Sequence, residues 1–357
     1  TDRQTDRQTD RQTDRQTDRQ TDRQTDMDIA KGIGIICVIL GHMGIDDVGS
    51  IIYSFHMPMF FLISGYFMKE YSLREVFQKR SRRLLPPYFL TCIMVMVLDT
   101  LKNLISVLLH KKTGNYLICK VFYWLYAMVY GAGTEHIEPF RIVPIGAVWF
   151  LLALLWASCI VCFAEKRKYS EIIILGFALV GFYSSKIIWL PWSVQAGMTS
   201  SLFMFVGLQL KRSEFFEIAR SKVQNCTLFV ACLVIWINEM CIENFDLSIA
   251  RNSFPNGFFD VIGSVCGSIC MILISGAIAR VQIFHVLSWF GKNSLIILCA
   301  HLVELNVIPW NQIANLIFRV KEPIILYVLL MKFFWCTLVT ILVLKLKVLY
   351  TCGKRKR

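Results

Sequence analysis

Two histidines lie inside the first two apolar segments of the chain, where ionisable side chains are rare. His42 is near the end of MDIAKGIGIICVILGHMG, and His56 lies in IIYSFHMPMFFLISGYF together with Ser64. An ionisable group within a membrane span is costly unless it is paired or hydrated, so both histidines are functional candidates. Pro58 follows His56, and a proline inside a span is tolerated where the helix lines a cavity. The two segments are therefore expected to border a polar cavity.

The opposite end of the first segment carries two charged residues, Asp28 and Lys31. Lys31 and His42 are eleven residues apart, so on a helix they lie near one face and about 16 Å from each other. We expect one end of this helix to hold an anion while His42 works deeper in the membrane.

A basic cluster, KRSRRLLPPY, follows the second segment and contains Lys79, Arg80, Arg82 and Arg83. Several arginines at one point suit bidentate binding of phosphates. The alternative is a basic anchor that contacts lipid headgroups.

Other polar or aromatic residues within apolar runs give weaker signals. Each of them taken alone is expected to be a structural hydrogen-bonding group or a cation whose stem lies along apolar surface. They are Asp99, Lys102, Trp149, Phe150, Leu151, Asn293, Ser294, His301 and Lys332.

The elements that position these residues are membrane helices. The 357 residues are 55% hydrophobic and only 18% charged, whereas a soluble domain carries about 25% charged residues. Runs of roughly 17 to 25 apolar residues recur, and each is long enough to cross a bilayer. The composition excludes a soluble enzyme, a disordered chain, a coiled coil and a secreted disulfide scaffold. It predicts an all-α, polytopic membrane helix bundle with about ten transmembrane helices, over 29–45, 51–68, 86–109, 145–164, 171–190, 193–210, 225–242, 260–279, 286–304 and 323–344.

The loops between these segments indicate an orientation. Loops after even-numbered spans and the carboxyl tail are rich in Lys and Arg, as short cytoplasmic loops are, so both termini are expected in the cytoplasm. The long outward segment 110–144 is expected to form a lid or an interfacial helix, because LICKVFYWLYAMVYG is aromatic and suits the headgroup level.

The net charge of +13 does not indicate a nucleic-acid partner, because the surplus lies in short loops between apolar runs. Most of the 13 cysteines lie inside apolar runs, where thiols pack as small hydrophobic groups. Cys159 and Cys162 form a Cys-x-x-Cys pair, but without a second pair at zinc spacing. No metal is expected.

Residues 1–26 are six copies of TDRQ followed by TD. Such a polar tract cannot form a core, so we expect a disordered tail over 1–26, a transmembrane domain over 27–350 and a basic cytoplasmic tail over 351–357. Repeated ACAG nucleotides encode Thr-Asp-Arg-Gln in every frame. We hypothesise a translated tetranucleotide repeat, in which gain or loss of one unit switches the gene off, as in bacteria that vary their surface glycans. A neutral flexible tail is the alternative.

The chain resembles acyltransferase family 3, the integral membrane O-acyltransferases that modify bacterial surface polysaccharides and lipopolysaccharide. Its members open with an acid, a base three residues later and a histidine at the end of the first helix, here Asp28, Lys31 and His42. The segments YSFHMPMFFLISGYF and RSRRLLPPY, a mid-chain Trp-Phe-Leu and a late Gly-x-Asn-Ser-Leu…His are also similar. The similarity runs from Met27 to about residue 345, although Leu-Cys-Ala replaces the usual aromatics before His301.

The resemblance implies transfer of an acyl group, most often acetyl, from acyl-CoA (acetyl-CoA) in the cytoplasm to a sugar hydroxyl outside the bacterial inner membrane. It implies that His42 takes the hydroxyl proton during attack on the thioester, and that Asp28 and Lys31 shape the cytoplasmic mouth. The partners would be acyl-CoA, a cell-surface glycan or lipid-linked saccharide, and the bilayer. The other roles are CoA phosphate binding by Arg80, Arg82 and Arg83, and orientation of the base or the oxyanion by Tyr53, His56 and Ser64.

Two other functions fit some of these features. Intramembrane charges and a proline-broken helix also mark transporters, but the later half has no second copy of the 51–88 pattern that paired broken helices would require. A non-catalytic receptor or assembly protein is the third possibility.

Overall fold

The computed structural model describes residues 24–109, 113–218, 221–242, 246–319 and 325–355. The described residues form helices and loops, with isolated bridges and no strand. The predicted disordered tail lies outside them, except that residues 24–26 already belong to the first helix, which is helical over 24–41. The predicted tail from residue 351 continues the last helix as far as residue 355.

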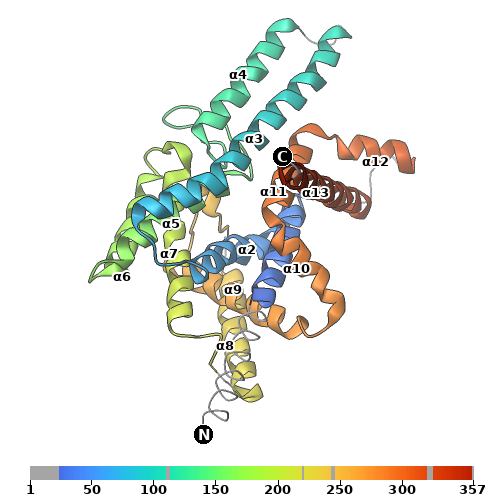
Figure 1. Cartoon of the computed structure of the whole chain (residues 1–357). Coiled ribbons are helices and arrows are strands. Elements are labelled where there is room, and N and C mark those ends of the chain that lie inside the picture. Colours follow the sequence, from blue (N-terminus) through green and yellow to red (C-terminus); the bar gives the residue numbers. More distant parts are fainter. Residues whose placement is uncertain (1–23, 110–112, 219–220, 243–245, 320–324, 356–357) are drawn as a thin grey trace.

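The helices follow one another through turns, 3-10 turns and two longer connections, α4 to α5 and α8 to α9 (Figure 1). After the first helix (24–41) they are α2 (Asp46–Tyr66), α3 (Leu73–Leu108), α4 (Gly114–Tyr130), α5 (Trp149–Glu165), α6 (Ser170–Ser184), α7 (Val194–Arg212), α8 (Lys222–Met240), α9 (Phe258–Ile278), α10 (His285–Lys292), α11 (Ser294–Val307), α12 (Trp310–Phe318) and α13 (Ile325–Arg355). The 3-10 turns are η1 (Pro191–Ser193), η2 (Ile249–Arg251) and η3 (Gln282–Phe284).

Several of these helices are long and apolar enough to cross a membrane. Among the described residues they are α2, α3, α8, α9 and α13, and η3 to α11 forms a sixth candidate that is bent by 69°. Two shorter apolar helices, α5 and α6, accompany them. Each of the ten predicted spans overlaps a helix, and α4 falls on the predicted interfacial stretch 117–131. The all-helical class and the membrane character are thus confirmed, and the count of ten spans stays a prediction.

The centre of the bundle is α2, which packs between α7 and α9. Its contact with α7 depends on two glycines. A Cβ atom on Gly65 would lie 1.8 Å from the carbonyl oxygen of Met204, and one on Gly207 would lie 1.9 Å from that of Leu62. Small residues of this kind let helix backbones approach closely in membranes, where van der Waals packing replaces the hydrophobic effect.

The helix α3 is longer than the sequence predicts, because it begins before the basic cluster. Ser72 is its N-cap, and its side chain accepts a hydrogen bond from the backbone N–H of Glu75 while the Glu75 carboxylate accepts one from the backbone N–H of Ser72. This capping box satisfies backbone N–H groups of the first turn, so the helix can begin at Leu73, before the basic cluster. The basic cluster therefore lies on helical turns rather than in a loop, and the helix continues through Pro86 and Pro87.

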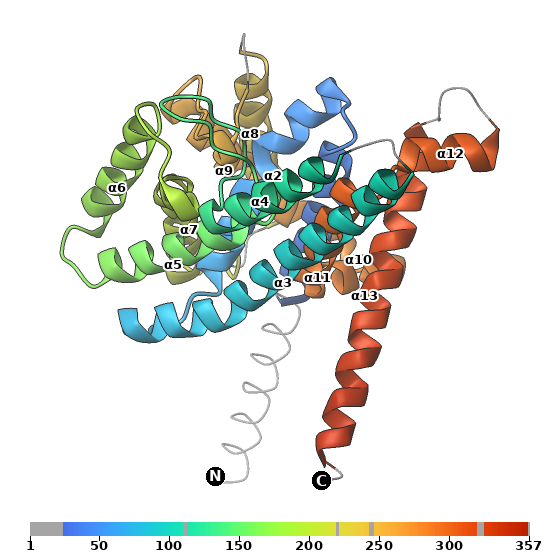
Figure 2. The same cartoon turned by 90° about the horizontal axis from the view of Figure 1, so that it is seen from above.

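Two features flank the bundle. The helices α3 and α4 form a hairpin that extends from the body, and buried Asp99 joins them by accepting a 2.9 Å hydrogen bond from the indole N–H of Trp124 (Figures 1 and 2). Asp99 is thus the structural hydrogen-bonding group that the sequence predicts. The long helix α13 runs beside α11, on the side of the bundle away from α5 and α6 (Figure 2).

Candidate functional site

A cavity of about 740 Å³ runs through the bundle along the first helix. The residues of this helix that line it recur every three or four positions, so they form a single stripe. They are Gln24, Asp28, Lys31, Ile35, Val38 and His42. The spacing argument from the sequence therefore holds in three dimensions, because Lys31 and His42 face the same cavity.

The second wall is a stripe of α2 with the same helical spacing. It comprises Tyr53, His56, Met57, Phe60, Ile63, Ser64 and Phe67. The third wall, on α3, includes Val76, Lys79, Arg80, Arg83 and Leu84. Arg82 falls between these turns, is exposed and does not line the cavity. The cavity is also lined by Trp149, Phe150 and Leu151 of the mid-chain segment and by Ser294 of the late segment.

One end of the cavity, here called the cationic end, gathers basic side chains. These are Lys31, Lys69, Lys79, Arg80, Arg83 and Lys292. The one acidic residue among the described lining residues is Asp28, whose Oδ1 atom lies 2.5 Å from Nζ of Lys31. Asp28 is fourteen residues from His42, about 21 Å along the helix, so it positions Lys31 and does not reach His42. Lys79 lies 3.3 Å above the ring of Tyr71, which also lines this end.

His42 lies deeper, and its side chain is exposed to the cavity. Its Nδ1 atom is 2.7 Å from the carbonyl oxygen of Val38. Because a carbonyl oxygen only accepts hydrogen bonds, Nδ1 must carry the proton, and in the neutral ring Nε2 then has the free lone pair. The local helix geometry therefore holds His42 in the tautomer that a base needs.

His56 makes the same kind of bond, with Nδ1 2.6 Å from the carbonyl oxygen of Ile52, but it is buried. The ring of Tyr53 lies 5.4 Å from that of His56, and the Tyr53 hydroxyl donates a 3.0 Å hydrogen bond to the carbonyl of Gly41. Tyr53 therefore fixes the turn next to His42. Ser64 lines the cavity two helical turns from His56, about 12 Å towards the cationic end.

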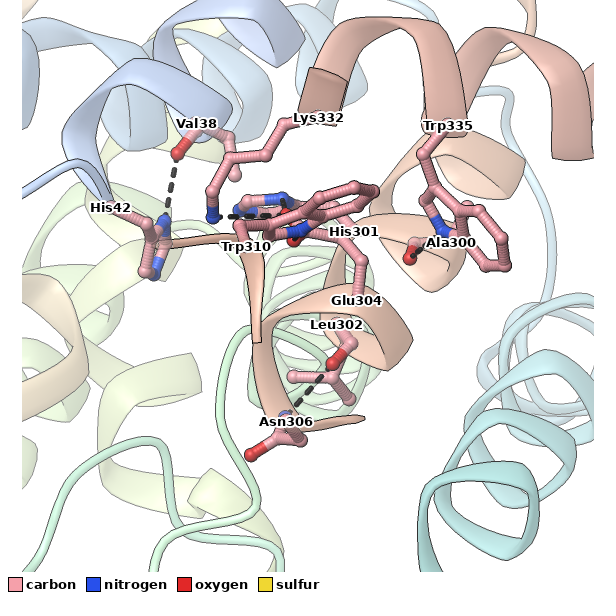
Figure 3. A network of polar contacts seen from close by, with 10 residues as sticks. All are labelled: Val38, His42, Ala300, His301, Leu302, Glu304, Asn306, Trp310, Lys332 and Trp335. Atoms are coloured by element: carbon pink, nitrogen blue, oxygen red, sulfur yellow. Dashed lines mark hydrogen bonds and ion pairs between the residues drawn. The ribbon is translucent and has the colours of Figure 1, made fainter. Parts of the chain in front are cut away.

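Behind His42 lies a buried polar network that joins three late helices (Figure 3). The rings of His42 and His301 meet edge to face, with centroids 5.1 Å apart. The Nδ1 atom of His301 is 2.6 Å from Oε1 of Glu304, and Nζ of Lys332 is 3.2 Å from the same oxygen. The other Glu304 oxygen accepts a hydrogen bond from the indole N–H of Trp310.

His301 and Lys332 are structural hydrogen-bonding groups in this network, as the first predicted alternative states, and the second alternative, a cation that extends along apolar surface, is wrong for Lys332. His301 and Glu304 are fully buried, and Lys332 is 6% exposed. Lys332 therefore does not reach towards the membrane surface. It balances a buried carboxylate, because an unpaired charge in such a place is costly. Nε2 of His301 has no hydrogen-bond partner in the described part of the chain. Glu304 was missed, although an acid three residues after a histidine on an apolar helix is itself a signal.

The opposite end of the cavity, here called the loop end, is bordered by two loops. They contribute Gly133, Thr134, Gly146, Ala147, Leu247, Ser248, Ile249, Ala250 and Arg251. His136 of the first loop stacks on Trp189 with ring centroids 4.3 Å apart, and burial lowers its pKa from the ordinary value. His136 is therefore neutral near pH 7. Within the described ranges, no group of three or more His, Cys, Asp or Glu residues could hold a metal ion.

Comparison with known proteins gives one match. A family model described as an acyltransferase domain (acyltransferase family 3) covers residues 24–345, which is nearly the whole chain. No curated protein and no solved structure matches the chain.

Proposed function

The chain belongs to acyltransferase family 3 and is a membrane acyltransferase, and from that premise we propose that it moves an acetyl or other acyl group from cytoplasmic acyl-CoA to a hydroxyl of a cell-surface saccharide or lipopolysaccharide. One observation carries this proposal. A single cavity joins a cationic end to His42 and continues to a loop end on the far side. Two substrates that approach from opposite ends could therefore meet at one imidazole.

The cationic end suits the phosphates of coenzyme A. Lys31, Arg80 and Arg83 all face the cavity there, and guanidinium groups bind phosphate through paired, charge-assisted hydrogen bonds. Arg82 points elsewhere, so it is left out of this role. From the phosphates, the pantetheine arm would follow the stripe of the first helix, about 16 Å from Lys31 to His42.

The reaction balances with His42 as the only proton carrier. Nε2 of His42 takes the proton of the acceptor hydroxyl as its oxygen attacks the thioester carbon. The carbon–sulfur bond then breaks, and the imidazolium gives the proton to the leaving thiolate, so that an ester and free coenzyme A remain. The carboxylate of Glu304 lies behind His301 and is paired with it through Nδ1, so it holds the His301 ring that packs against His42. Direct transfer of this kind needs no acyl-enzyme, and His56 and Ser64 then only shape the cavity.

The test is transfer of labelled acetyl from acetyl-CoA to saponified surface glycan, with protein in membrane vesicles. His42→Gln should lower the rate by at least about 100-fold, which is the lower range for loss of a general base. His285→Gln is the matched control, because His285 is exposed and its Nε2 bonds the carbonyl of Ala279 outside the cavity. Ester formation that survives His42→Gln unchanged would contradict the base assignment. Movement of labelled saccharide across the vesicle without any ester would favour a transporter.

We further propose that the cationic end faces the cytoplasm of a bacterial inner membrane, with both termini on that side. Lys69 before α3 and the basic cluster on the first turns of α3 support this orientation, because Lys and Arg near the ends of membrane spans favour the cytoplasmic side. Reporter fusions after residue 71 and after residue 357 should both be active in the cytoplasm, and a periplasmic signal from either would contradict the topology.

The repeat tract supports a separate proposal, that expression is phase-variable. If residues 1–26 derive from an ACAG repeat, each of the four amino acids is encoded by the same codon in every copy. Clonal isolates should then differ in the number of repeats. Sequencing the gene from single colonies tests this directly. Mixed synonymous codons across the tract would rule the repeat origin out.

A further inference from the structure

The loop end of the cavity is rigidly built. Leu247 and Ile249 are each 2% exposed and pack into the main core. Asn252 adopts a left-handed conformation at φ 50°, and its side-chain oxygen accepts a 2.6 Å hydrogen bond from the hydroxyl of Thr199 on α7. The hydroxyl of Thr134 on the other loop donates to the carbonyl of Ala250 at 3.4 Å. The segment 246–254 therefore presents fixed groups to the cavity.

One of these groups is charged. Among the described residues with which the two loops line the cavity, Arg251 is the one with a charged side chain. Its Nη2 atom donates to Oδ1 of Asp246 at 2.6 Å, yet the two side chains remain 47% and 59% exposed. The other donors of the guanidinium stay available, because this side chain has five N–H groups.

The ion pair with Asp246 is not enough to give Arg251 a structural role in the loop. Pairs between exposed side chains contribute little to stability, and the loop is already held by its buried apolar residues and by Asn252. A lone guanidinium on the acceptor side of the base is instead placed to recognise a substrate.

We propose that Arg251 binds an anionic group, a carboxylate or a phosphate, on the acceptor saccharide and so orients the hydroxyl that is acylated. This inference rests on the proposed function and narrows its substrate to acidic glycans. Neutral saccharides would enter the same cavity without this anchor and react more slowly. The acid nearest to the guanidinium is its partner Asp246, which does not line the cavity, and the described lining residues of the two loops include no other acid.

The experiment compares three acceptors with each variant in membrane vesicles supplied with acetyl-CoA. The acceptors are saponified surface glycan of the host, the same glycan after carboxyl reduction, and the same glycan after removal of phosphate by hydrofluoric acid. Arg251→Gln should lower kcat/KM about 10- to 100-fold on the intact glycan, as expected for loss of a charge-assisted hydrogen bond. The chemical treatment that removes the recognised anion should lower wild-type activity by a similar factor and abolish the difference between variant and wild type.

Two matched variants separate recognition from loop structure. Arg141→Gln removes an arginine from the other loop that is 74% exposed, paired with Glu135 and absent from the cavity lining, so it should leave kcat/KM unchanged. Asp246→Asn breaks the ion pair but keeps the Arg251 charge, so it should retain most activity.

Carboxyl reduction and dephosphorylation identify which anion is bound. The inference is overturned if neither treatment changes wild-type activity, or if Arg251→Gln slows intact and treated glycans equally. It is also overturned if Asp246→Asn is as damaging as Arg251→Gln. Failure of the proposed function is distinct from all of these, because wild-type protein would then form no ester on any of the three acceptors.

Discussion

Glu304 is the residue on which the buried network behind His42 depends. It accepts from His301 at 2.6 Å and from Lys332 at 3.2 Å, and its second oxygen accepts from Trp310. The substitution Glu304→Gln keeps the size of the side chain but removes the charge and turns one acceptor into a donor. Lys332, at 6% exposure, would then be a buried cation without a counter-ion.

The expected loss of stability follows from this geometry. Breaking a buried pair by removing one partner costs about 3–5 kcal/mol, because the remaining charge is uncompensated. Thermal and chemical unfolding of the detergent-solubilised protein measure this quantity. Glu165→Gln provides a control with a smaller expected loss, since Glu165 is 14% exposed but its partner Arg212 is 41% exposed and is hydrated when the pair is broken.

A second substitution separates stability from chemistry. Glu304→Gln combined with Lys332→Met removes both charges, so it should recover about 1–3 kcal/mol relative to the sum of the single variants. The double variant should nevertheless stay about 100-fold or more below wild type in transfer rate, because His301 has still lost its carboxylate acceptor. The reasoning is wrong if Glu304→Gln is no more destabilising than Glu165→Gln, or if the double variant regains full activity.

Two further predictions test the walls of the cavity. Arg83→Gln should raise KM for acetyl-CoA about tenfold, as measured in vesicle assays, while Arg82→Gln, whose side chain is exposed outside the cavity, should change it less than twofold; equal effects would indicate a diffuse electrostatic role. Gly65→Ala should destabilise the protein by about 1–3 kcal/mol or more, because a Cβ atom would lie 1.8 Å from the carbonyl oxygen of Met204. Gly176→Ala on α6, with nothing within 4 Å of the added atom, should leave the unfolding temperature unchanged or raise it, and similar losses for both would refute the packing argument.

The local part of the site could be predicted from the sequence. Residues on one helix have a fixed angular relation, so the spacing of Lys31 and His42 is enough to place both on one face. On α3 the lining residues Val76, Lys79, Arg80, Arg83 and Leu84 recur at the same helical spacing, and Arg82 falls off this stripe. A count of positive charges does not separate residues that line the cavity from those that do not. The predicted phosphate-binding set therefore includes Arg82, which is exposed outside the cavity.

The helical class was also predictable, because composition and segment length determine it. The start of α3 was predicted too late because hydropathy does not register a capping box, although the Ser72–Glu75 pair has the spacing that marks a helix start. The structure confirms a helix over the aromatic stretch, α4, and its interfacial position stays a prediction; α4 packs along α3, and the hydrogen bond from Trp124 to Asp99 joins the two segments.

The surroundings of the proposed base come from parts of the chain that are far apart in sequence. His42 is on the first helix, His301 and Glu304 are on α11, and Lys332 is on α13. A single sequence treats His301 and Lys332 as two isolated polar residues in apolar runs, and each alone is best explained as structural. The structure shows that both residues bond the same carboxylate, that of Glu304. A lysine that neutralises the carboxylate allows a negative charge to exist in the membrane interior, and that charge in turn fixes the proton of His301 on Nδ1. The ring of His42 therefore packs edge to face against a histidine whose orientation is fixed by a network with balanced charges, and this holds His42 in place beside the cavity.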